Sequence, residues 1–98
     1  MRVALLSPDL LFGSKVEGAL RAAGHDVVHD AAAGGADAFV VDLTQGEVPE
    51  PPGHPVLGFY SHVEQEVRAR AEELGYDRVV PRSRMNREAA ALVEGLAR

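Results

Sequence analysis

The chain has 98 residues, of which 46% are hydrophobic and 26% charged, a composition typical of a soluble globular protein with one modest core. Its net charge of -5 gives it no electrostatic reason to bind nucleic acid or an anionic membrane, and the lack of cysteine excludes disulfides, thiolate catalysis and cysteine zinc sites. No apolar run approaches the roughly 20 residues of a membrane span, so we expect one cytoplasmic domain over residues 1–98.

The chain is predicted to open with a strand followed by a helix. The apolar run at 3–6 predicts a buried strand, which a proline ends. The helix is expected to begin between Leu10 and Ser14, because Ser14 and Glu17 have the spacing of a capping box. Gly24 follows the last apolar residue of the helical pattern and suits a C-terminal cap.

Two further strands are predicted before the middle of the chain. Residues 25–30 have two valines between polar ends, which suits a short edge strand. Residues 31–37 are small and leave room for at most one helical turn. The run at 38–43 is apolar at both alternating sets of positions, which favours a central parallel strand with Asp42 at its carboxyl end. Four prolines and two glycines make a helix improbable in 44–55.

The second half is predicted to alternate strand and helix. A strand at 56–60 precedes Ser61 and Glu64, which again have capping-box spacing, and an apolar stripe that ends at Gly75. A short strand at 78–81 follows.

The closing helix carries apolar residues at helical spacing up to Leu96, and Ser83 or Asn86 is expected to be its N-cap. Alternation of strands and helices implies a parallel sheet with right-handed crossovers. Two helices are missing from that alternation, after the second and third strands.

This order of elements resembles that of the CheY-like receiver domain of response regulators. Three segments carry the resemblance: Ala22-Ala23-Gly24 before the second strand, Val40-Val41-Asp42-Leu43 on the third, and Glu73-Leu74-Gly75-Tyr76-Asp77 before the fifth. The resemblance implies a flavodoxin-like α/β three-layer sandwich with a parallel five-stranded sheet of order 2-1-3-4-5. Helices two and three of that fold would be reduced or absent.

The resemblance places Asp42 at the position of the phosphate-accepting aspartate. In that family an acidic pair after the first strand holds Mg²⁺, which neutralises the charge of the transferred phosphoryl group. Here this pair falls on Ser7 and Pro8, neither of which carries a carboxylate, and Asp9 comes one residue later. Magnesium is therefore expected only under an alternative in which Asp42 and Asp9 bind it together, and no other cofactor is predicted.

The remaining positions of the family's site depart from its pattern as well. The hydroxyl at the end of the fourth strand falls on Tyr60 or Ser61, and Arg82 and Ser83 stand where a lysine-proline pair is expected. A guanidinium group matches phosphate and carboxylate geometry, so Ser61 and Arg82 form a candidate anion site. The other interpretation of Asp42 is a polar strand end that faces solvent and pairs with Arg82 or caps a turn.

Three functions follow from these residues. The leading hypothesis is a non-catalytic pseudo-receiver, a protein-interaction module of bacterial signalling type that is not an enzyme. The second is a phosphoacceptor of a two-component system that uses Asp42, with Asp9 helping to bind magnesium. The third is an anion-binding or small-ligand-binding domain that uses Ser61 and Arg82.

A symmetric homodimer is predicted, formed either by the face that the missing helices leave uncovered or by the helix at 63–74 with the strand at 78–81, the surface that receivers often use. The third strand presents apolar residues to both faces of the sheet, and one face would keep only one of its three helices. The Pro-rich segment at 48–55 is expected to fold over part of that face. His25 and His29 are about 13 Å apart on a strand and cannot share a metal ion. His62 follows Ser61 and is therefore expected to lie near the candidate site.

Overall fold

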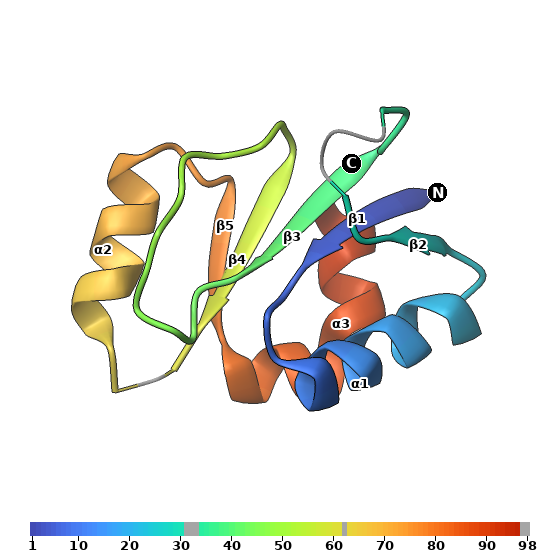
Figure 1. Cartoon of the computed structure of the whole chain (residues 1–98), viewed down its shortest axis with the longest axis horizontal. Helices are drawn as coiled ribbons and strands as arrows, with labels where there is room; N and C mark the ends of the chain where they lie inside the picture. The colour runs from blue at the N-terminus through green and yellow to red at the C-terminus, as the bar shows by residue number, and fades with distance from the viewer. Residues whose placement is uncertain (31–33, 62, 97–98) are drawn as a thin grey trace.

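The computed structural model describes residues 1–30, 34–61 and 63–96. Its elements are, in chain order, β1 (Arg2–Leu6), α1 (Leu10–Ala22), β2 (Asp26–Val28), β3 (Ala38–Asp42), β4 (Val56–Tyr60), α2 (Gln65–Glu73), β5 (Arg78–Pro81) and α3 (Arg82–Leu96). All neighbouring strands are parallel, and their order is β2-β1-β3-β4-β5 (Figure 1). The predicted fold class and strand order are confirmed. None of the described helices is both long and apolar enough to cross a membrane.

The two faces of the sheet have separate cores. On one face α1 and α3 pack against each other and against side chains of the central strands, including Val40 and Phe59. On the other face α2 covers a smaller cluster that includes Val41 and Tyr76. The alternation along β3 explains this division, because successive side chains of a strand point to opposite faces.

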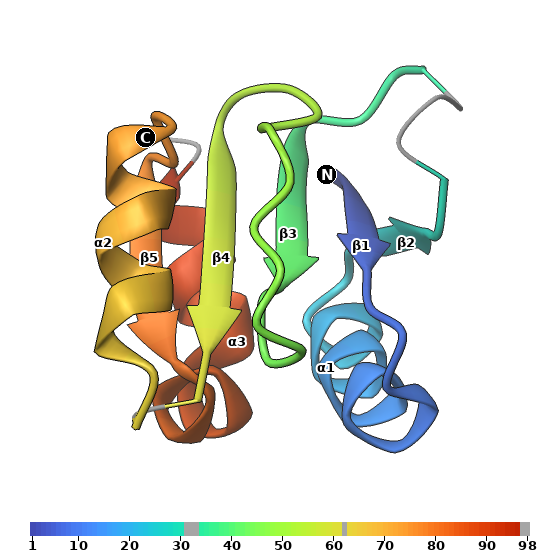
Figure 2. The ribbon, with the colours of Figure 1, turned by 60° about the vertical axis from the view of Figure 1, so that its left-hand side comes forward.

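A Pro-rich segment takes the place of one missing helix. Residues 43–55 contain no helix and run back along β3 and β4 on the face opposite to α3 (Figure 2). Val48 packs against the smaller cluster, and the Tyr76 hydroxyl donates a hydrogen bond to the carbonyl oxygen of Pro49 at 2.9 Å. Gly53 lies so close to the Phe39 ring that a Cβ atom there would be 2.4 Å from a ring carbon. The segment therefore covers part of the face that the missing helices leave open.

The ends of the helices are only partly as predicted. Gly24 and Gly75 follow α1 and α2 with positive φ angles of 91° and 93°, which confirms their capping role. α1 begins at Leu10, within the predicted range, but the capping boxes predicted for α1 and α2 are wrong. Asp9 caps α1 with its side chain, so Ser14 lies inside the helix. Glu64 precedes α2 without a side-chain cap bond.

The closing helix also begins earlier than predicted. Arg82 follows the last residue of β5 directly and is the first residue of α3, so Ser83 and Asn86 lie within the helix and are not its N-cap. The connection has no loop, which fixes the first turn of α3 at the carboxyl edge of the sheet. Residues 34–37 are not helical, whereas the rest of the predicted turn at 31–37 lies outside the described residues.

Candidate functional site

The sheet brings the predicted site residues to one edge. Leu6 pairs with Val41, so Ser7 follows β1 beside Asp42 at the end of β3. Tyr60 pairs with Pro81, so Ser61 and Arg82 likewise follow neighbouring strands. The carboxyl edge of an open parallel sheet is where ligands bind in folds of this class.

Asp42 is a buried carboxylate with three hydrogen-bond donors. It is 7% exposed, and its Oδ2 accepts a bond of 2.6 Å from the Ser7 hydroxyl. Its Oδ1 accepts bonds from the Thr44 backbone N–H, at 2.8 Å, and from the Thr44 hydroxyl. A carboxylate has about four acceptor sites, so these neutral donors occupy most of them. Asp42 thus caps the turn that follows β3.

The carboxylate of Asp9 is directed to α1 and α3. Its Oδ1 accepts the backbone N–H groups of Leu11 and Phe12 at 3.1 and 3.0 Å, and its Oδ2 lies 3.6 Å from Arg82. Arg82 therefore pairs with Asp9 and not with Asp42. Ser7 links the two acidic residues only indirectly, because its hydroxyl contacts the backbone of Asp9 as well as the Asp42 side chain.

The donor set at this edge does not fit magnesium well. Mg²⁺ prefers an octahedral set of oxygen ligands, whereas the oxygens of Asp9 and Asp42 already accept hydrogen bonds from different groups. Among the described residues, no three histidine or acidic side chains gather closely enough to hold a metal ion. The predicted pair of Asp9 and Asp42 stays a prediction.

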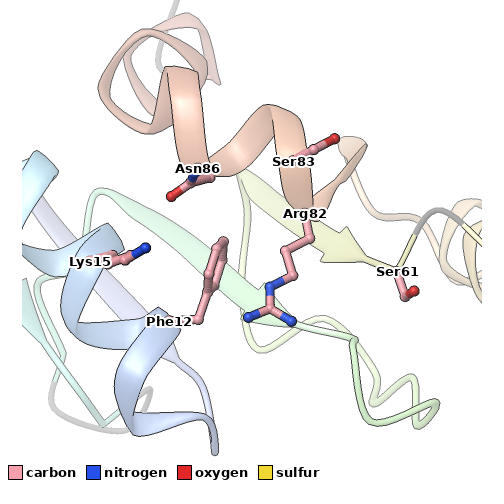
Figure 3. A pocket seen from close by; sticks show the side chains of 6 residues that line it. All are labelled: Phe12, Lys15, Ser61, Arg82, Ser83 and Asn86. Carbon is pink, nitrogen blue, oxygen red and sulfur yellow. The ribbon is translucent and has the colours of Figure 1, made fainter.

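Ser61 and Arg82 share a cavity of about 400 Å³ between α1 and α3. Its lining consists of Phe12, Lys15, Ser61, Arg82, Ser83 and Asn86 (Figure 3). The Arg82 guanidinium lies over the Phe12 ring, 4.5 Å from its centre. The side chain of Tyr60 is buried in the smaller core cluster, so of the two predicted hydroxyls Ser61 is the one at the cavity.

Sequence reasoning missed the contribution of α1 to this cavity. Phe12 and Lys15 come from the helix that packs against α3, and their position depends on how the two helices cross. The available signal was that Lys15 is the only lysine of the chain. Of the neighbouring arginines, Arg84 and Arg87 lie 3.4 and 3.8 Å from Glu88 and do not line the cavity.

A second cavity, of about 650 Å³, is lined in part by Asp42. Leu6 and Val41 of the sheet and Val48 and Pro49 of the Pro-rich segment contribute its apolar lining, and Asp42 lies at its polar part. Asp42 therefore lines this second cavity and not the first, and only the first is lined by cations.

The histidines do not form a metal site in the part of the chain that the structure describes. His25 contacts the N-terminal amine at 3.2 Å and Glu94 at 2.9 Å, whereas His29 pairs with Glu17 at 2.8 Å. His54 pairs with Asp77 at 2.9 Å. His62 lies outside the described residues, so the suggestion that it is near the site is not tested.

No protein-family model matches the sequence, and no curated protein is similar enough to count as a relative. Solved structures do match. A response regulator from Thermotoga maritima superposes with a TM-score of 0.76 and 15% identity, covering 98% of this chain and 96% of that one. The chain has the fold of response-regulator receiver domains.

Two other receiver-type structures agree with this assignment. The receiver domain of the TMAO respiratory system response regulator TorR has a TM-score of 0.76 and 12% identity, with 97% of this chain and 94% of that chain covered. HP1043, an orphan response regulator of H. pylori, has a TM-score of 0.73 and 19% identity, with coverage of 100% and 97%. The receiver fold therefore extends over nearly the whole chain, although the helices of the described residues number three.

Proposed function

We propose that this chain is a cytoplasmic, receiver-like regulatory module that acts through protein contacts and does not accept a phosphoryl group on Asp42. The observation that carries the proposal is the 2.6 Å hydrogen bond from Ser7 to Asp42. A hydroxyl stands where the receiver resemblance requires a carboxylate. The Asp42 carboxylate thus accepts hydrogen bonds from neutral donors. No second carboxylate lies beside it among these donors, so no cation is needed to balance a pair of negative charges.

The environment of Arg82 supports the same proposal. In receivers a lysine at the end of the fifth strand grips the phosphoryl group. Here the guanidinium is stacked on Phe12 and paired with Asp9, on the α1 and α3 side of the sheet. A phosphoryl group on Asp42 would have to draw this side chain away from both contacts.

Beryllofluoride with Mg²⁺ gives a direct test, because it mimics a phosphoryl group on a carboxylate without covalent chemistry. We expect no saturating change in the amide NMR spectrum of the wild type beyond that of an Asp42→Asn control. A change that requires Asp42 would support the second candidate, a phosphoacceptor that uses Asp9 and Asp42 with magnesium.

The predicted homodimer loses part of its support. It was inferred from an uncovered apolar face, and the Pro-rich segment covers β3 and β4 on that face. Val41 is accordingly buried and Phe39 is half-buried. Self-association stays a prediction, and light scattering at high concentration tests it: a monomer would remove it.

A further inference from the structure

The cavity between α1 and α3 has a charge opposite to that of the chain. The protein carries a net charge of -5, yet the lining includes Lys15 and Arg82 and no carboxylate. We propose that this cavity binds a small phosphate-bearing molecule. The proposal goes beyond the regulatory role argued above, because the cavity does not include Asp42.

Arg82 is held in position before any ligand arrives. Its guanidinium lies over the Phe12 ring, and that ring in turn packs on Phe59 with 5.2 Å between centres. Asp9 contacts one guanidinium nitrogen at 3.6 Å. The side chain remains 48% exposed, and a guanidinium has five N–H donors, so donors are left for an anion. A pre-organised cation loses little conformational entropy on binding.

Lys15 supplies the second cation from the opposite helix. It is exposed and forms no ion pair with any of the described residues. In Figure 3 Lys15 and Asn86 point toward each other from α1 and α3, and Arg82 extends beside Phe12. Cations from two packed helices thus line the same cavity, whereas Arg84 and Arg87 of α3 are paired with Glu88.

The donors favour a phosphate over a carboxylate. Besides the two cations, the lining offers the amide of Asn86 and the hydroxyls of Ser61 and Ser83. A phosphate monoester presents three terminal oxygens that share up to two negative charges, and it can accept more of these bonds than the two oxygens of a carboxylate. The volume of about 400 Å³ falls in the range of small-ligand pockets and leaves room for an organic group beside the phosphate.

The test is an amide NMR titration of the whole chain with inorganic phosphate, and separately with glycerol phosphate, at constant ionic strength. We expect saturable shifts that concentrate on residues lining the cavity, and none with glycerol. Tighter binding of glycerol phosphate would identify an organic phosphate as the ligand type, and equal binding would identify free phosphate. Absence of saturable shifts with both would overturn the proposal.

A charge-matched pair of variants excludes a general effect of net charge. Lys15→Gln removes one cation from the cavity and is expected to weaken binding about tenfold, the usual effect of one charge-assisted bond. Arg68→Gln removes one cation from α2, where Arg68 pairs with Glu72 at 3.5 Å, and should change affinity less than about twofold. Equal losses in the two variants would contradict a specific site. Because the Lys15 side chain is exposed, we expect the Lys15→Gln variant to fold.

Discussion

Replacement of Gly53 by alanine tests whether the Pro-rich segment is seated on the sheet in place of a helix. A Cβ atom at this position would lie 2.4 and 2.6 Å from two carbons of the Phe39 ring, closer than real Cβ contacts. Gly53 does not have a positive φ angle, so the backbone itself accepts alanine. The expected effect is therefore steric. Overpacking of this kind costs about 1–3 kcal/mol of unfolding free energy.

Gly18→Ala is the matched control for this experiment. Gly18 lies in the middle of α1, and a Cβ atom added there would meet no other atom within 4 Å, so alanine should stabilise the helix by up to about 1 kcal/mol. Urea unfolding followed by circular dichroism measures both variants. The Phe39→Ala background removes the ring and should abolish most of the cost of Gly53→Ala.

Tyr76 offers a second readout of the seated segment. Burial raises the pKa of the Tyr76 hydroxyl above its ordinary value, and that hydroxyl bonds to Pro49. If alanine at position 53 lifts the segment, the pKa of Tyr76 should fall toward its ordinary value in an absorbance titration. Stabilisation by Gly53→Ala, or a cost that persists without the Phe39 ring, would refute the reasoning.

Two further predictions concern acidic groups. Hydrogen bonds from His54 and from the Val56 N–H hold the pKa of Asp77 below its usual range. The ionised Asp77 therefore stabilises the fold fully at pH values above the pKa that it has in the unfolded chain. This contribution is lost as the pH falls through the lowered pKa of the folded protein. Asp77→Asn should flatten the loss of stability between about pH 6 and pH 2 in urea unfolding, and an unchanged slope would contradict this. Ser7→Asp places a second carboxylate beside buried Asp42 and should lower the free energy of unfolding by about 1–3 kcal/mol in the absence of metal. Addition of Mg²⁺ should restore much of that stability. Thermal unfolding of this variant that does not depend on magnesium would contradict the prediction.

Hydrophobic periodicity was sufficient to predict the strands, whereas their order in the sheet was implied by the resemblance to receiver domains. The apolar run of β3 marks a strand buried on both faces, and the glycines after α1 and α2 mark helix ends because only glycine readily adopts their positive φ angles. The start of α1 at Leu10 lies within the predicted range, but its N-cap was predicted wrongly because Ser14 and Glu17 have capping-box spacing within the helix. The true cap is Asp9, whose position depends on the chain leaving β1.

Only the part of the candidate site that lies at strand ends could be predicted from the sequence. Asp42 ends β3, Ser61 and Arg82 directly follow β4 and β5, and parallel pairing brings such residues to one edge. Lys15 and Asn86 come from two helices that face each other, and their approach depends on side-chain packing that periodicity does not specify. The hydrogen bond from Ser7 to Asp42, on which the proposed function rests, likewise could not be predicted from the sequence and is seen only in the structure.

The central claim, that Asp42 is a structural residue and not a phosphoacceptor, is tested most directly by intact-mass spectrometry. The chain is incubated with Mg²⁺ and a small acyl phosphate, beside an Asp42→Asn control and an established receiver domain as positive control. We predict that neither wild type nor variant gains the mass of a phosphoryl group while the positive control does. A phosphoryl adduct on the wild type that the Asp42→Asn variant lacks would contradict the account.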